Sequence, residues 1–64
     1  MEDYQIRVVE ERDELHKKIC RLDMFIHSGV FANLENKVEQ DNLIFQLDVM
    51  RLYCKILEAR ISCF

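Results

Sequence analysis

Apolar residues in the first part of the chain recur at the spacing of an amphipathic helix. This stripe comprises Val8, Leu15, Ile19, Leu22 and Ile26. Three of them repeat every seven residues and the other two lie beside them on the same helical face. Arg12 falls on that face too and is its polar exception. The pattern predicts a helix from about Asp3 to about His27, and we expect Ser28 and Gly29 to end it, because glycine tolerates the left-handed backbone common at helix ends.

A short segment, VFANL, separates this helix from the next. We expect Phe31 and Leu34 to hold one irregular or helical turn against the core. The second helix should begin near Asn36, because Glu39 three residues later resembles a capping box, and it should run nearly to the end of the sequence.

The second helix carries two apolar seams. The first, with intervals of four and three residues, is Leu43, Leu47, Met50, Cys54, Leu57 and Ile61. The second, on roughly the opposite side, is Phe45, Val49, Leu52 and Ile56. A single partner helix covers only one of these faces, so the other should contact another chain. The sequence therefore predicts an all-α, antiparallel helical hairpin, one domain over residues 1–64, that assembles into a homo-oligomer of at least two chains.

The charges favour antiparallel helices. Cations late in the first helix (Lys17, Lys18, Arg21) should lie near acidic residues early in the second (Glu35, Glu39, Asp41, Asp48). Cations late in the second helix (Arg51, Lys55, Arg60) should lie near acidic residues that begin the first (Glu2, Asp3, Glu10, Glu11). The preference is modest because exposed ion pairs contribute little.

Composition narrows the possible functions. Half of the 64 residues are hydrophobic and a third are charged, with no proline and one glycine, as expected for helices with apolar seams. A chain this short buries little surface alone. The net charge of −3 argues against a DNA or RNA binder but allows a small anionic ligand held by local cations. No apolar run approaches membrane-spanning length and no signal peptide is visible, so the sequence predicts a cytosolic protein. In that reducing compartment we expect the three cysteines to be free thiols, with Cys54 as a core residue.

Catalytic and metal chemistry find little support in the sequence. His16 and Cys20 are one helical turn apart, but two ligands do not make a zinc site and no second pair completes one. No group orients the histidine for a Cys/His nucleophile, and no glycine-rich phosphate loop is present. We therefore expect no enzyme, no metal and no cofactor.

Polar residues flank the apolar stripe of the first helix within one narrow sector. They are Tyr4, Arg7, Glu11 and Lys18. They could be a coiled-coil flank in which charged side chains bridge neighbouring helices. They could also form an anion pocket at a subunit interface, where a tyrosine stacks on a base and cations meet phosphates. Periodicity alone favours the flank.

The sequence resembles a known family along nearly its whole length, from Tyr4 to Ile61. The resemblance rests on YQIRVVEERDELHKKICRLDMFI, VFANL and NLIFQLDVMRLYCKILEARI. Its polar members, which a generic coiled coil would not require, are Tyr4, Gln5, Arg7, Lys18, Gln46 and Arg60. The chain is similar to the small phage anti-CBASS sponges, the second described type of anti-CBASS protein, which bind cyclic oligonucleotides.

The resemblance implies a compact hexamer that binds cyclic dinucleotides, and in some members cyclic trinucleotides, without cleaving them. Such a protein would act in the cytoplasm of the infected host and remove the signal that activates a cell-killing effector. The expected ligand-binding residues are Tyr4, which would stack on a base, Lys18 and Arg7 as cations, and Arg60 in a second pocket. The alternative function is a structural or adaptor coiled coil that binds a protein partner through its second seam.

Overall fold

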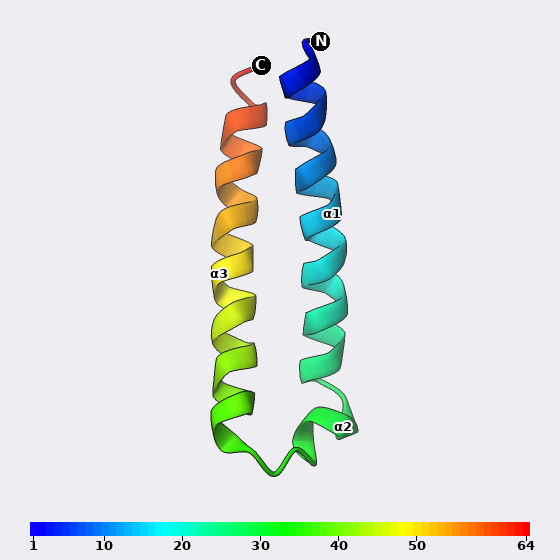
Figure 1. Ribbon diagram of the computed structural model, residues 1–64, viewed down its shortest axis with the longest axis vertical. Coiled ribbons are helices and arrows are strands. Elements are labelled where there is room, and N and C mark those ends of the chain that lie inside the picture. The colour runs from blue at the N-terminus through cyan, green and yellow to red at the C-terminus, as the bar shows by residue number, and fades with distance from the viewer.

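The computed structural model describes all 64 residues as a helical hairpin. Its helices are α1 (Asp3–Ile26), α2 (Gly29–Ala32) and α3 (Lys37–Ile61). The long helices α1 and α3 lie side by side and antiparallel, α2 lies at the turn, and both ends of the chain lie at the opposite end (Figure 1). The molecule is a rod of 47 × 14 × 14 Å. The predicted all-α hairpin is confirmed, with helix bounds within one residue of those expected.

Ser28, and not Gly29, separates α1 from α2. The Ser28 hydroxyl donates to the Phe25 carbonyl and accepts from the Phe31 N–H at 3.4 Å, so it binds the end of one helix and the start of the next. Gly29 is the first residue of α2 and its φ is not positive. The expectation that Gly29 ends the helix in a left-handed conformation is wrong, because the serine side chain makes the break by capping α2.

Two side chains hold the turn and start α3. The Gln40 amide donates to the carbonyls of Phe31 and Leu34, both at 3.0 Å, which ties the first turn of α3 to the backbone of the connection. Phe31 and Leu34 are half-buried, as expected, and the Phe31 ring packs edge to face on Phe25. Asn36 is the N-cap of α3, and its side chain accepts from the Glu39 N–H at 3.2 Å.

The core is a single line of apolar contacts between α1 and α3. Its buried members are Val8, Leu15, Ile19, Leu47, Cys54 and Leu57, with Leu22, Ile26, Met50 and Ile61 packed against them. These are the stripe of the first helix and members of the first seam of the second, as predicted. Only six of the 64 residues are buried, which is very little apolar burial for a folded domain.

Two ion pairs cross between the long helices. Arg12 donates to Glu58 at 2.8 Å and Arg51 donates to Asp23 at 3.1 Å. They fit an antiparallel arrangement, but neither joins the groups of charges that the sequence suggested. Both pairs flank the packed face, whereas residues such as Lys17 face away from α3 and bind within α1, to Glu14 at 3.4 Å.

None of the helices combines the length and apolar character required to cross a membrane. All three cysteines are free; Cys54 is buried in the core as predicted, and Cys20 and Cys63 are exposed.

Candidate functional site

Tyr4 lies in the first turn of α1, with its side chain at the surface. The turn is fixed by the Glu2 N–H, which donates to the Gln5 side chain at 2.8 Å. Tyr4 is 57% exposed, and its ring meets Phe64 edge to face, with centroids 5.9 Å apart and planes at 78°. Most of the aromatic surface therefore remains available for stacking.

The cations Arg7 and Lys18 follow Tyr4 along the same side of α1. Both are exposed, and neither forms an ion pair within the hairpin. Free, exposed cations of this kind can bind an anion without first giving up a carboxylate partner.

Arg60 lies in the last turn of α3, at the same end of the rod as Tyr4. It too is exposed and forms no ion pair. The antiparallel fold thus places Tyr4, Arg7 and Arg60 toward one end of the molecule, although no direct contact joins them.

Lys18 lies far along α1 from the end of the molecule that holds Tyr4. Fourteen residues of continuous helix separate it from Tyr4, or about 21 Å at about 1.5 Å per residue. One chain therefore cannot close Tyr4 and Lys18 on opposite sides of a compact ligand. A pocket that uses both must draw them from different chains.

The structure also has a shallow hollow that the sequence analysis missed. It lies between α1 and α3 and is lined by Arg12, His16, Ile19, Arg51, Cys54, Lys55 and Glu58. The lining holds three permanent cations and one carboxylate, a balance that favours anions. A signal was present in the sequence: Arg12 and His16, like Arg51 and Lys55, are spaced four residues apart, which aligns each pair on one side of its helix.

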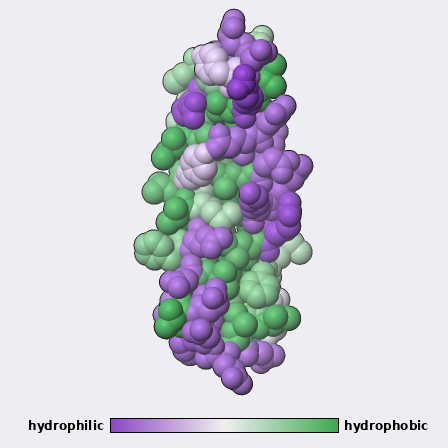
Figure 2. All heavy atoms as spheres, viewed as in Figure 1, coloured by the Kyte–Doolittle hydropathy of each residue, from purple (hydrophilic) through white to green (hydrophobic).

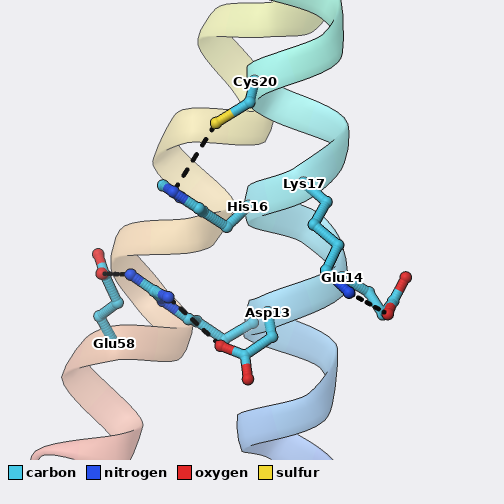
Figure 3. Close-up of polar contacts among 7 residues, drawn as sticks. Asp13, Glu14, His16, Lys17, Cys20 and Glu58 are labelled. Atoms are coloured by element: carbon cyan, nitrogen blue, oxygen red, sulfur yellow. Dashed lines mark hydrogen bonds and ion pairs between the residues drawn. The ribbon is translucent and has the colours of Figure 1, made fainter.

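Most of the charge in this hollow is already paired. The Arg12 guanidinium lies between Glu58 at 2.8 Å and Asp13 at 3.3 Å (Figure 3). These bonds raise the pKa of Arg12 above its ordinary value, with the hydrogen bond to Glu58 as the largest cause. His16 Nε2 lies 3.8 Å from the Cys20 sulfur, a weak contact within one helical turn. No three potential metal ligands lie close together.

The second apolar seam of α3 faces away from α1. Phe45, Val49, Leu52 and Ile56 are between 52% and 70% exposed. Apolar residues accordingly recur down the α3 edge of the molecule in Figure 2. The predicted exposure of this seam is confirmed, and such a continuous apolar strip marks an interaction surface.

Comparison with known proteins identifies the family. The family model described as Sequestin matches residues 2–63. The chain belongs to the Sequestin family. This confirms the resemblance to anti-CBASS sponges, and sequestins are binding and sequestering proteins. The matched range includes Tyr4, Arg7, Lys18 and Arg60.

A curated relative of this sequestin comes from Enterobacteria phage T4. It is an uncharacterised 7.5 kDa protein from the denB–rIIB intergenic region, 43% identical over 61 residues that cover 95% of this chain and 94% of the relative. The similarity to a phage protein extends over the whole hairpin. No solved structure matches the chain.

Proposed function

We propose that this sequestin is a phage anti-defence sponge that binds cyclic dinucleotides of the host CBASS system in the cytoplasm of the infected cell. The observation that carries the proposal is the family match over residues 2–63, together with an aromatic ring and cations that stand exposed on one side of α1. Cyclic dinucleotides offer bases for stacking and two phosphates for cations, which are the chemistries these residues supply.

The ligand pocket forms between chains. Tyr4 of one chain stacks on a base, Lys18 of another neutralises phosphate, and Arg7 adds a supporting cation. The length of α1 between Tyr4 and Lys18 supports this division of roles. The assembly is a homo-oligomer, a hexamer by the family resemblance, and Arg60 belongs to a second pocket.

The mechanism is titration without cleavage. A sponge lowers the free concentration of the signal in proportion to its own abundance and affinity, so it needs no turnover, metal or cofactor. The ligand leaves the complex chemically unchanged.

Calorimetric titration against a panel of cyclic di- and trinucleotides tests the proposal. We expect saturable binding of at least one cyclic dinucleotide. The released ligand, recovered after denaturation and analysed by chromatography, should be intact. Absence of binding across the panel, or linearised product, would overturn the sponge mechanism.

The exposed seam of α3 favours one alternative, a coiled-coil adaptor that binds a protein partner. Thermal melting separates the two functions. A ligand that binds the folded state raises the melting temperature by mass action, whereas an adaptor melts at the same temperature with and without cyclic dinucleotides.

A further inference from the structure

The exposed face of α3 carries a longer heptad pattern than its four large apolar residues show. Its members recur at alternating intervals of four and three residues and are Val38, Asn42, Phe45, Val49, Leu52, Ile56 and Ala59. We call this set the outer seam. All seven residues are exposed in the hairpin, and Val38 is 67% exposed. A repeat of this kind over nearly the full length of α3 is the pattern of a helix that pairs with another helix.

We propose that the outer seam pairs with the outer seam of a second copy of the chain, with the two α3 helices antiparallel. The inference rests on the assembly part of the proposed function and is independent of ligand binding. It adds the contact face, the orientation and the register.

Side-chain size supports the antiparallel orientation. In that register Phe45 lies opposite Ile56 of the second copy, Val49 opposite Leu52, and Asn42 opposite Ala59. Each layer then combines a larger with a smaller or similar side chain, and every layer occurs twice by symmetry. A parallel pair would place two Phe45 rings in one layer and two Ala59 methyl groups in another, so one layer would be overfilled and another underfilled.

The charges beside the outer seam also favour the antiparallel orientation. The antiparallel register brings Asp48 next to Lys55 of the second copy and Glu39 next to Arg60, each twice. A parallel register would instead bring Lys55 next to Arg60, a like-charge contact. Individual exposed pairs contribute little, but all four complementary contacts favour the antiparallel pair, and the parallel pair has none.

These flanking charges are also available. Glu39, Asp48, Lys55 and Arg60 are exposed, and none of them forms an ion pair within the hairpin. The ion pairs between α1 and α3 use a different set of residues. The two sides of α3 therefore carry separate charge patterns, one for α1 and one for the second copy.

Cysteine crosslinking tests orientation directly. In a Cys20→Ser, Cys63→Ser background, which leaves only the buried Cys54, three variants are made: Asn42→Cys, Ala59→Cys, and both together. Residues 42 and 59 are seventeen positions apart on one straight helix, about 25 Å at about 1.5 Å per residue, so the double variant cannot close a disulfide within its own chain. Circular dichroism checks that each variant keeps its helical content.

We expect the double variant to form a covalent dimer under mild oxidation, without cyclic nucleotide, while each single variant stays uncrosslinked. Crosslinking of the single variants would show a parallel pair and overturn the proposal. Absence of a crosslink in all three, or equal crosslinking in all three, would overturn it as well. Because no ligand is present, the outcome is separate from the calorimetric test of cyclic-dinucleotide binding.

The charge contacts have their own test. Asp48→Lys alone should weaken dimer formation by the double-cysteine variant, since it faces Lys55 of the second copy. Adding Lys55→Asp restores opposite charges and should return the yield of covalent dimer. A charge swap that fails to restore the yield would exclude the proposed register.

Discussion

The Tyr4 ring in the first turn of α1 packs edge to face against Phe64, which lies beyond the end of α3. The contact ties the two ends of the hairpin together and leaves one face of the Tyr4 ring, the ring proposed to stack on a base, free of Phe64. An aromatic pair of this kind contributes about 0.5–1.5 kcal/mol when well packed, and less at an exposed site.

The two rings should differ in their effect on ligand binding. Tyr4→Ala should abolish cyclic-dinucleotide binding because it removes the stacking surface. Phe64→Ala should keep it, because stacking requires only one face of Tyr4. Calorimetric titration of both variants is the measurement, with helical content by circular dichroism as the control. Equal losses in both variants would assign the effect to the helix ends and not to stacking.

Mixed assemblies test whether Tyr4 and Lys18 serve one pocket from different chains. Lys18→Ala should abolish binding as Tyr4→Ala does, with oligomer size unchanged. When the two variants are mixed and exchange subunits, some pockets should regain both wild-type residues and bind again. Exchange is followed with a mass-tagged chain, and demonstrated exchange without recovery of binding would exclude the shared pocket.

Gly29 offers a stabilising substitution. It has a helical conformation without positive φ, and a Cβ added there would meet no atom within 4 Å. Gly29→Ala should therefore raise the free energy of unfolding by about 0.4–1 kcal/mol, because alanine loses less conformational entropy on folding. Chemical denaturation measures the change. A lower stability would mean that Gly29 needs a conformation other than the one in the hairpin.

Two leucines of α3 lie on its opposite faces, Leu57 on the inner face toward α1 and Leu52 on the outer face. Leu57 is 0% exposed and Leu52 is 62% exposed in the hairpin. Leu57→Ala should lower the free energy of unfolding by about 2–5 kcal/mol at any protein concentration, since it leaves a cavity between α1 and α3. Leu52→Ala should reduce stability mainly where chains are associated. Denaturation at two protein concentrations distinguishes these effects.

Charge in the outer seam should disrupt assembly. Phe45→Glu together with Ile56→Glu would bury unpaired carboxylates in the interface, so the oligomer should dissociate or unfold. Met24→Glu is the matched control, because Met24 is a similarly exposed apolar residue on α1, outside the outer seam. Light scattering reports the mass. A stable helical monomer of the unmodified protein would contradict the prediction.

The apolar spacing predicted the helices and their packed faces well. Val8, Leu15 and Ile19 are buried where the heptad places them, and Asn36 caps α3 as its position suggested. Periodicity decides these features because burial on one helical face is the main source of stability. The break at Ser28 and Gly29 falls where it was predicted, but the expected left-handed glycine is absent, because a serine hydroxyl that binds two helix ends depends on the three-dimensional turn.

For the candidate ligand site, the sequence predicts the exposure of single residues but not their arrangement. Exposure of Tyr4 and Lys18 follows from their places beside the stripe, but their proposed pairing depends on other chains, and one sequence does not specify how chains meet. Interhelical ion pairs were also missed: Arg12 and Glu58 meet because both flank the packed face, a relation that charge grouping along the chain does not reveal.

The thin line of buried residues between α1 and α3 has a consequence for the timing of the proposed sponge activity. A hairpin with so little buried surface would gain much of its stability from the proposed association, so its folded fraction would rise with the amount synthesised. At low copy number the chains would then be less stable and more accessible to host proteases. Once enough copies accumulate, the proposed association and folding would reinforce each other. The protein would then appear in active form over a narrow range of expression, as a threshold response.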